Sequence, residues 1–287
     1  MNSDPTILRP ALRYYGGKWN LAPWIIQHFP AHQFYCEPCG GAASVLLQKP
    51  RSDIETYNDL DGQVVNFFRM LRDRRDELID KIRLTPWSRS EYYASLAPCP
   101  ECDEVEQARR FWCAISMSFN SGTHFRQQGV RFVSDNHQST GEMNRPDLMK
   151  NLYLIADRLN EVQIENRDAL WVIKQYDSPD TLFYADPPYV SDTRTDSKVY
   201  AHEWTNDDHI AAAEVLRACA GYVVISGYAC PLYTELYEAH GWQRFDKLST
   251  MNRGGARLES IWLSPRSVAA LNRPRQSTLF DLISEEA

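Results

Sequence analysis

The sequence predicts a doubly wound α/β fold, in which helices cover both faces of a mainly parallel sheet and an antiparallel hairpin forms its C-terminal edge. Two observations predict it. Short apolar runs that indicate strands alternate with longer runs of helical periodicity, and the alternation resumes after an interruption in the middle of the chain. The chain has 287 residues, of which 43% are hydrophobic, so it can bury a substantial core and is neither a disordered tail nor a fibre.

The alternation begins with two strands that each lead into a helix. The pattern predicts, in order, a helix, a strand, a helix, a strand and a helix, over residues 18–29, 33–36, 42–48, 54–57 and 63–72. The first strand stops at Glu37-Pro38-Cys39-Gly40-Gly41 and the second at Asn58-Asp59. The last helix of this part depends on Val64, Phe68 and Leu71, which recur at helical spacing.

The second half of the chain continues the pattern. It predicts one helix, two strands, a second helix and a third strand, over residues 146–159, 162–165, 181–185, 206–220 and 222–226. Two further strands, over residues 242–248 and 258–263, are joined by a loop rich in Gly and Arg. This arrangement indicates the antiparallel hairpin at the edge of the sheet.

A region of different composition interrupts the chain at residues 86–146. It holds an acidic cluster, several prolines and polar loops, with one helix-like run around residues 108–119. We interpret this region as a small, mainly helical inserted domain. The main domain is then discontinuous, over residues 1–85 and 147–265, and residues 266–287 are expected to form a C-terminal tail.

Charge and cysteine content restrict the function. The chain has 31 Lys and Arg against 38 Asp and Glu, a net charge of -7, so any contact with nucleic acid must be local. The seven cysteines are an odd number, and the N-terminus lacks the basic and apolar segments of a secretion signal, so we expect a reducing, cytoplasmic location. Since no run of eighteen apolar residues occurs, no membrane span is expected.

Residues that directly follow strands are candidates for ligand binding, because ligands of such sheets bind beyond the carboxyl ends of the strands. Gly40 and Gly41 let a ligand approach the backbone closely, although an ordinary turn has the same pattern. Asp59 lies 19 residues after Gly40, where a carboxylate can accept both hydrogen bonds from a ribose diol. Alternatively, Asp59 caps a helix that starts near Asp61. Other residues that follow predicted strands are Asp168, Asp186 and Ser226.

The strongest signal is Tyr184-Ala185-Asp186-Pro187-Pro188-Tyr189, directly after an apolar strand. Prolines lack an N–H group, so this turn offers free carbonyls beside one carboxylate and one aromatic ring. Such a set suits a planar base with an exocyclic amino group, because Asp186 and the Pro187 carbonyl can accept its two hydrogens while Tyr189 stacks on the ring. The alternative is a rigid proline turn with a structural role.

Four motifs resemble, in order and spacing, those of the Dam-like DNA adenine-N6 methyltransferases, which use S-adenosylmethionine. The motifs are Arg13-Tyr14-Tyr15-Gly16-Gly17-Lys18, Glu37-Pro38-Cys39-Gly40-Gly41, Asn58-Asp59 and Asp186-Pro187-Pro188-Tyr189. The resemblance implies a Rossmann-like methyltransferase sheet and methyl transfer to the amino group of an adenine flipped out of duplex DNA. The sequence departs from the family at Cys39, where a bulky residue is usual.

The resemblance also implies roles for individual residues. The cofactor would be held by Tyr14, Tyr15, Gly16, Gly17, Lys18, Glu37, Pro38, Cys39, Gly40 and Gly41. Asp59 would bind its ribose, and Asp168 would accept a hydrogen bond from the amine of its adenine. The target adenine would be gripped by the catalytic residues Asp186, Pro187, Pro188 and Tyr189. No metal is required by this chemistry.

Other functions compete with this interpretation. A methyltransferase of RNA or of a protein glutamine amide would use a similar proline turn, and a catalytically inactive DNA-binding regulator could keep the fold. A nicotinamide dehydrogenase is excluded, because Gly40-Gly41 is not followed by the third glycine of the dinucleotide fingerprint. The resemblance leaves open whether a restriction enzyme accompanies the protein in a restriction-modification pair.

Local basic residues are the candidates for contact with DNA. Residues 247–275 carry six basic residues and one acid, and Arg253 and Arg257 in the hairpin are expected to contact phosphates. The alternative is a solvated loop. Asn120 lies in a partial match to the family's recognition motif, and Arg126 and Arg131 could reach bases in the major groove. Because the match is partial, no recognised DNA sequence follows from it.

Two shorter patterns have alternative explanations. Cys36-X-X-Cys39 and Cys99-X-X-Cys102 have the spacing of zinc ligands, but a metal at the first pair would obstruct the cofactor. Residues Gln276 to Phe280 resemble the peptides that dock on bacterial sliding clamps through a glutamine and a Leu-Phe pair. An amphipathic tail that folds onto its own domain has the same pattern.

Overall fold

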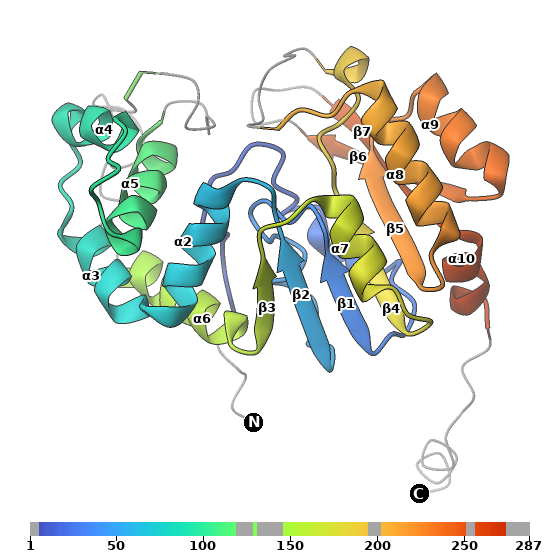
Figure 1. The fold of residues 1–287 in the computed structure, drawn as a ribbon, viewed down its shortest axis with the longest axis horizontal. Helices are drawn as coiled ribbons and strands as arrows, with labels where there is room; N and C mark the ends of the chain where they lie inside the picture. Colours follow the sequence, from blue (N-terminus) through green and yellow to red (C-terminus); the bar gives the residue numbers. More distant parts are fainter. Residues whose placement is uncertain (1–5, 119–128, 131–145, 195–201, 251–255, 274–287) are drawn as a thin grey trace, which may run out of the picture.

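The computed structural model describes residues 1–287 except 1–5, 119–128, 131–145, 195–201, 251–255 and 274–287. The described residues form a seven-stranded sheet in the order β3-β2-β1-β4-β5-β7-β6 (Figure 1). The strands are β1 (Phe34–Glu37), β2 (Ile54–Asn58), β3 (Val162–Glu165), β4 (Thr181–Ala185), β5 (Tyr222–Gly227), β6 (Gln243–Thr250) and β7 (Ala256–Leu263). The pairs among β1 to β5 are parallel, whereas β7 runs antiparallel to β5 and β6. The predicted mainly parallel sheet with an antiparallel C-terminal hairpin is confirmed.

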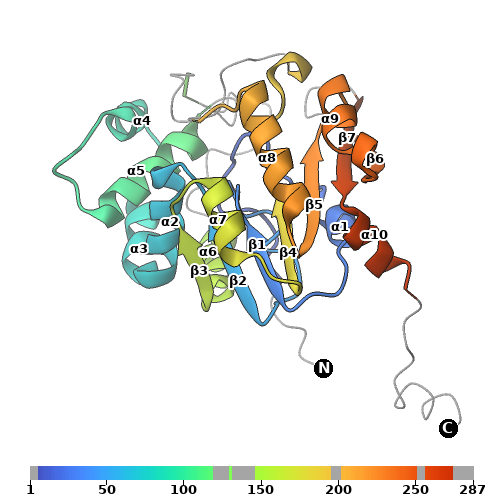
Figure 2. The ribbon, with the colours of Figure 1, turned by 45° about the vertical axis from the view of Figure 1, so that its right-hand side comes forward.

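The central strands send successive side chains into two different hydrophobic clusters, because side chains alternate between the two faces of a strand. In β4, Leu182 and Tyr184 enter one cluster, and Phe183 and Ala185 enter the other. The first cluster includes residues of α1 (Ala22–Ile26), α2 (Gly62–Asp73) and α6 (Pro146–Leu159), and the second those of α7 (Ala169–Tyr176), α8 (Asn206–Ala218) and α9 (Pro231–Leu236). Figure 2 shows α7 and α8 in front of the sheet. Burial on both faces explains why the strand is a continuous apolar run.

Helices of the predicted insert lie beyond α2, at one end of the sheet (Figure 1). They are α4 (Arg89–Leu96) and α5 (Glu104–Met117), preceded by α3 (Arg75–Leu84). The side chain of Asp103 accepts a hydrogen bond from the Glu106 N–H and so caps α5. Trp112 of α5 donates from Nε1 to the Ala11 carbonyl at 3.0 Å. The buried face of α5 therefore joins the hydrophobic cluster of α2 and α6, and these helices share one core with the sheet.

Two predicted helices differ in the structure. The helix expected over residues 18–29 is limited to α1, which has Pro23 in its first turn. Residues 42–48 form turns instead of a helix. Gly41 and Ala43 have φ angles of 47° and 54°, which a right-handed helix cannot contain. Contacts between this loop and the end of β2 hold the chain in this shape.

Other helices were not predicted from the sequence. These are α3, α4, α7, α9 and α10 (Pro265–Leu271). The prediction of a tail from residue 266 was wrong for α10. Ser264 caps this helix through the Ser267 N–H, and the buried Ser267 hydroxyl donates to the Val223 carbonyl of β5 at 3.1 Å. These bonds dock α10 on the sheet.

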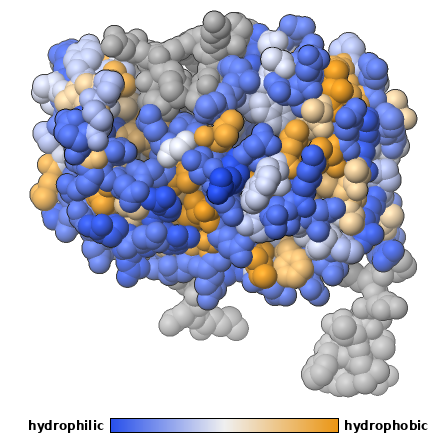
Figure 3. Space-filling model, viewed as in Figure 1, coloured by the Kyte–Doolittle hydropathy of each residue, from blue (hydrophilic) through white to orange (hydrophobic). Residues whose placement is uncertain are grey.

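The surface facing the viewer in Figure 3 is mainly hydrophilic, with apolar side chains in small separate groups. Single exposed apolar side chains, such as Leu84 and Tyr93, are ordinary on a protein surface. Within the described part of the chain, no helix combines the length and apolar character that crossing a bilayer requires.

A buried cluster of charges joins β2 to the turns after β1 and to α6. Glu55 accepts a hydrogen bond from Lys49 Nζ at 2.6 Å, and Arg158 also pairs with its carboxylate. The side chains of Lys49 and Glu55 are only 2% and 3% exposed. Burial alone would raise the pKa of Glu55, but the hydrogen bonds from Arg158 and Lys49 hold it below its ordinary value. The carboxylate is therefore charged in the folded protein.

We expect Glu55→Gln to lower the free energy of unfolding by about 3–5 kcal/mol, because it leaves Lys49 and Arg158 buried beside a neutral amide. Urea denaturation followed by circular dichroism measures this loss. Glu214→Gln is the matched control, since Glu214 is exposed on α8. A loss below about 1 kcal/mol for Glu55→Gln would contradict the importance of the cluster.

Candidate functional site

A pocket lies at the carboxyl ends of β1, β2 and β4, where the sequence predicted a ligand site. Its lining consists of Tyr14, Tyr15, Gly16, Gly17, Lys18, Glu37, Pro38, Cys39, Gly40, Gly41, Ala42, Ser44, Val45, Asp59, Leu60, Asp61, Asp168, Ala169, Tyr184, Asp186, Pro188, His202 and Trp204. All twelve residues predicted to contact the cofactor line it, together with Asp186 and Pro188 of the proline turn. The structure thus brings together segments that are far apart in the sequence.

The loop over residues 37–41 takes its shape from close contact with β2. The Gly40 N–H donates to the Asn58 carbonyl at 2.7 Å. A Cβ atom at Gly40 would lie 2.3 Å from the Tyr57 ring, so only glycine fits there. The Tyr57 hydroxyl donates to the Gly41 carbonyl at 2.7 Å. These contacts hold the loop backbone against the pocket.

The side chain of Asn58 connects the loops that follow three strands. Its Nδ2 donates to the Pro38 carbonyl at 2.7 Å and to the Arg167 carbonyl at 3.0 Å. Its Oδ1 accepts a hydrogen bond from the Arg167 N–H at 2.9 Å. Asn58 is fully buried. Its amide therefore fixes the loops after β1 and β3 relative to the end of β2.

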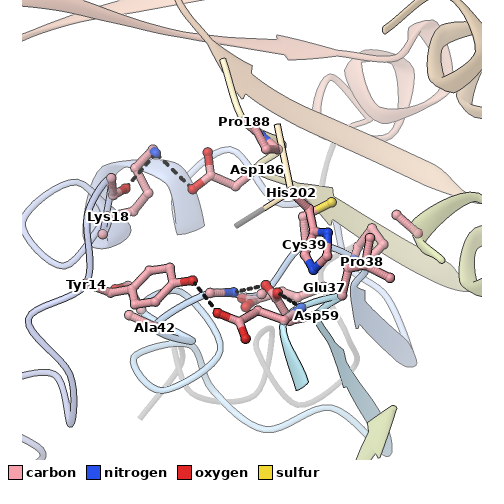
Figure 4. Close-up of a pocket in the computed structure, with 18 of the residues that line it drawn as sticks. Tyr14, Lys18, Glu37, Pro38, Cys39, Ala42, Asp59, Asp186, Pro188 and His202 are labelled. Atoms are coloured by element: carbon pink, nitrogen blue, oxygen red, sulfur yellow. Dashed lines mark hydrogen bonds and ion pairs between the residues drawn. The ribbon is translucent and has the colours of Figure 1, made fainter. Parts of the chain in front are cut away.

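Asp59 faces the pocket at its base in Figure 4. One carboxylate oxygen accepts the Gly41 N–H at 2.8 Å, and the other accepts the Asp61 N–H at 2.8 Å. The cap of α2 is Asp61, which accepts the Gln63 N–H. The alternative that Asp59 caps this helix is therefore wrong. Each oxygen of Asp59 keeps a further lone pair that a ligand hydroxyl can use.

Two carboxyl groups of the pocket differ in charge. Burial raises the pKa of Asp59 to about 6, although the N–H groups of Asp61 and Gly41 favour its charged form. Burial raises the pKa of Glu37 to about 8, against the effect of the Tyr35 hydroxyl, which donates to it at 2.5 Å. At pH 7 Asp59 is therefore mainly charged, and Glu37 mainly holds a proton.

Asp168 follows β3 and begins α7. Its Oδ1 accepts hydrogen bonds from the N–H groups of Leu170 and Trp171, both at 3.0 Å, and so caps the helix. Asp168 also lines the pocket. Because both cap bonds use the same oxygen, the second oxygen has its full acceptor capacity. The cap and a ligand contact are compatible at this position.

Asp186 lies on the side of the pocket opposite Asp59 (Figure 4). Lys18 Nζ donates to Asp186 Oδ2 at 2.8 Å and to the Gly16 carbonyl at 2.9 Å. The Ser226 hydroxyl, at the end of β5, donates to Asp186 Oδ1 at 2.6 Å. Asp186 is therefore held by groups from two different segments, with its side chain 19% exposed.

Tyr189, the aromatic residue of the proline turn, is buried. Tyr189 is 5% exposed, and its hydroxyl donates to Glu259 at 3.1 Å. Its ring faces Lys18 Nζ at 4.6 Å and meets the edge of Tyr228. Pro187 and Tyr189 are not part of the pocket lining in this structure. A base that stacks on Tyr189 would therefore have to take the place of the Lys18 ammonium.

Charge in the pocket favours a cationic ligand. Among its lining residues, Lys18 is the one Lys or Arg, and it pairs with Asp186, whereas the acids are Glu37, Asp59, Asp61, Asp168 and Asp186. The helix N-terminus that would attract a phosphate after Gly41 is not formed. The buried hydroxyl of Ser44 also lines the pocket and has no hydrogen-bond partner among the described residues. These features suit a cationic ligand with polar groups better than a dinucleotide phosphate.

Several lining residues were not predicted from the sequence. Besides neighbours of the predicted residues, they include Tyr184, His202 and Trp204. His202 and Trp204 come well after the proline turn in the sequence, and neither of them directly follows a predicted strand. The Trp204 ring packs against His209 of α8, with centroids 5.2 Å apart. Only the tertiary packing brings this segment to the pocket.

The predicted DNA contacts are described only at Arg257. Its Nη1 donates to the Tyr228 hydroxyl at 2.8 Å, and its guanidinium lies 4.8 Å from the centre of the Tyr228 ring. The predictions for Asn120, Arg126, Arg131 and Arg253 lie outside the described residues, as does the peptide Gln276 to Phe280.

The cysteines do not assemble the four-thiolate zinc site that the spacing allowed. Cys99 and Cys102 form a disulfide with each other, which a reducing location did not predict. Cys36 is buried in the hydrophobic cluster that includes α7, α8 and α9, and Cys39 lines the pocket. Glu101 lies beside this disulfide, whose two sulfurs offer no thiolate to a metal while they are bonded to each other.

Comparisons with known proteins agree with this arrangement. A family model described as D12 class N6 adenine-specific DNA methyltransferase matches residues 14–251. A type II methyltransferase of Lactococcus lactis subsp. cremoris is 25% identical over 252 residues, which cover 80% of this chain and 85% of that protein. A DNA adenine methylase of Serratia marcescens is 24% identical over 226 residues, which cover 72% of this chain and 76% of that protein. A type II methyltransferase of Methanocaldococcus jannaschii is 22% identical over 286 residues, 89% of this chain and 97% of that protein.

The family match covers every residue that lines the pocket, from Tyr14 to Trp204. It also includes the strands and loops that position Asp59, Asp168 and Asp186. The chain therefore belongs to the D12 class of N6 adenine-specific DNA methyltransferases.

Proposed function

We propose that this enzyme transfers the methyl group of S-adenosylmethionine to the amino nitrogen of an adenine that has rotated out of duplex DNA. The observation that carries the proposal is that Asp186 opens into the same pocket as Asp59 and Asp168. One part of the pocket can thus hold a nucleoside cofactor while another holds the acceptor for an amine. On this proposal the two reactants would lie side by side, which supports direct transfer between them.

The cofactor would lie along the loops that follow β1, β2 and β3. The segment 15–18 and the loop 37–41 would hold its methionine end, while Asp59 accepts the ribose hydroxyls and Asp168 the adenine amine. S-adenosylmethionine supplies an electrophilic methyl group on a cationic sulfur. The acidic lining of the pocket stabilises such a cation, and the Ser44 hydroxyl, which has no hydrogen-bond partner in the described part of the chain, offers a polar contact.

The target amine would be bound by Asp186 and the Pro187 carbonyl. These two acceptors draw the amine hydrogens out of the plane of the base, which frees the nitrogen lone pair for attack. Rotation of the base out of the helix costs a few kcal/mol, and stacking on Tyr189 offsets part of it. Since Lys18 Nζ lies over Tyr189, binding of the base requires this ammonium to move.

We also propose roles for the segments outside the pocket, from the family resemblance and from their local charges. Residues 86–146 would read the DNA sequence, and the basic hairpin with Arg253 and Arg257 would contact phosphates. Residues 276–280 would dock on a bacterial sliding clamp, and the reaction would take place in the cytoplasm. RNA and protein amides are the competing substrates. Transfer of label from tritiated S-adenosylmethionine to duplex DNA, but not to RNA, distinguishes them.

We expect Asp186→Ala to abolish methyl transfer, because it removes the charged acceptor of the amine, while cofactor binding remains within about threefold of the wild type. Tritium incorporation into unmethylated duplex DNA measures the transfer, and isothermal titration calorimetry measures binding of the cofactor. Asp192→Ala is the control, because Asp192 is exposed a short distance after the turn. An Asp186→Ala protein that still methylates DNA would show that the assignment is wrong.

We also expect the affinity for S-adenosylmethionine to fall below about pH 6, the pKa of Asp59. The charged form exists above this pH and accepts the ribose hydroxyls, so one pH unit below it the affinity should be about tenfold lower. Calorimetric titrations between pH 5 and pH 8 measure the change. Asp59→Asn should bind weakly at every pH, and Ser44→Ala, which alters another residue of the lining without a part in the pKa of Asp59, should keep the pH dependence. Equal affinity at pH 5 and pH 7 in the wild type would refute the role of Asp59.

A further inference from the structure

We propose that Ser226, itself held by Tyr184, positions the Asp186 carboxylate for the target amine. This inference rests on the proposed function and adds two residues to it. Ser226 lies near the end of β5, and Tyr184 lies on the neighbouring strand β4, two residues before Asp186. Both act through Asp186, so they are positioning residues.

The hydrogen bonds have a defined direction. The Ser226 Oγ lies 2.6 Å from Asp186 Oδ1 and 3.1 Å from the Tyr184 hydroxyl. A serine hydroxyl has one proton to donate, and the carboxylate, as the charged acceptor at the shorter distance, receives it. The Tyr184 hydroxyl therefore donates to Ser226 Oγ. Two donated bonds in series thus end on the carboxylate that receives the amine.

Burial makes this chain of bonds effective. Tyr184 and Ser226 are each only 2% exposed. Water therefore does not compete for the hydroxyl groups, and a charge-assisted bond in such surroundings is stronger than one at the surface. The strand is fixed on both sides, because β5 pairs with β4 and β7. A Cβ atom at the following residue, Gly227, would lie 2.7 Å from the Tyr233 ring, so the backbone cannot move far.

The orientation of Asp186 depends on this bond because a second donor competes for the carboxylate. Lys18 Nζ holds Oδ2 at 2.8 Å, and a carboxylate freed from Ser226 could rotate to bind this ammonium with both oxygens. The hydrogen bond from the Ser226 hydroxyl instead holds Asp186 Oδ1 near the end of β5 and so prevents this rotation. Each oxygen then retains a lone pair for the incoming amine.

The test compares hydroxyl deletions with matched controls. Ser226→Ala and Tyr184→Phe remove the two donors. Ser95→Ala and Tyr237→Phe are the controls, because Ser95 and Tyr237 are buried hydroxyl residues without a hydrogen-bond partner among the described residues. Single-turnover methyl transfer to unmethylated duplex DNA, calorimetric affinity for S-adenosylmethionine and melting temperature are measured for each protein.

We expect Ser226→Ala to lower the single-turnover rate about 10- to 100-fold, as loss of a hydrogen bond to a charged group predicts, and Tyr184→Phe to lower it less. The affinity for S-adenosylmethionine should stay within about twofold in both, and Ser226→Thr, which keeps the hydroxyl, should recover most of the rate. Both controls should retain the wild-type rate.

Three results would overturn the inference while leaving the proposed function intact. The first is a rate for Ser226→Ala no lower than that for Ser95→Ala, and the second is a fall in cofactor affinity as large as the fall in rate. If Ser226→Ala does not fold, Tyr184→Phe provides the test instead. A wild-type rate for Tyr184→Phe is then the third result that would overturn the inference. A wild-type protein that transfers no methyl group to DNA would refute the proposed function and this inference with it. Normal transfer by the wild type and by Ser226→Ala refutes the inference alone.

Discussion

The ion pair between Lys18 and Asp186 closes one side of the pocket. It joins an irregular N-terminal segment to the carboxyl end of β4, and the Lys18 and Asp186 side chains are 7% and 19% exposed. Burial of two charges is costly unless each is paired and its remaining hydrogen-bonding groups are satisfied. The Gly16 carbonyl and the Ser226 hydroxyl meet that condition here. The segment that closes the pocket is thereby held against the ends of the strands.

The side chains that line the pocket and those of residues 247–275 differ in charge. The pocket gathers carboxyl groups and suits a cationic cofactor, although burial keeps Glu37 mainly neutral at pH 7. The basic residues of 247–275 lie in a separate part of the chain. The described basic side chains of this stretch do not share one face, because Arg257 lies beside Tyr228, which follows β5, whereas Arg266 lies beside Tyr222, where β5 begins.

Sequence patterns predicted the strands better than the helices. The strands over residues 162–165 and 181–185 were placed correctly, because apolar runs end there at polar or proline-rich turns. Helices α4 and α9 were missed because they are short, and their burial depends on neighbours that are distant in the sequence. Residues 42–48 have helical composition but form turns, since the contact between Gly40 and Tyr57 imposes a backbone shape that no local pattern reveals.

Periodicity and turn chemistry are local properties of the chain, so they were enough to predict the fold class and the residues that follow each strand. They also placed Asp59, Asp168 and Asp186 at one edge of the sheet, since parallel strands end on the same side. No local pattern predicted that Ser226 and Lys18 hold the two oxygens of Asp186, or that His202 lines the pocket. These contacts join segments separated by tens to hundreds of residues, so they exist only after the strands have packed in their final order.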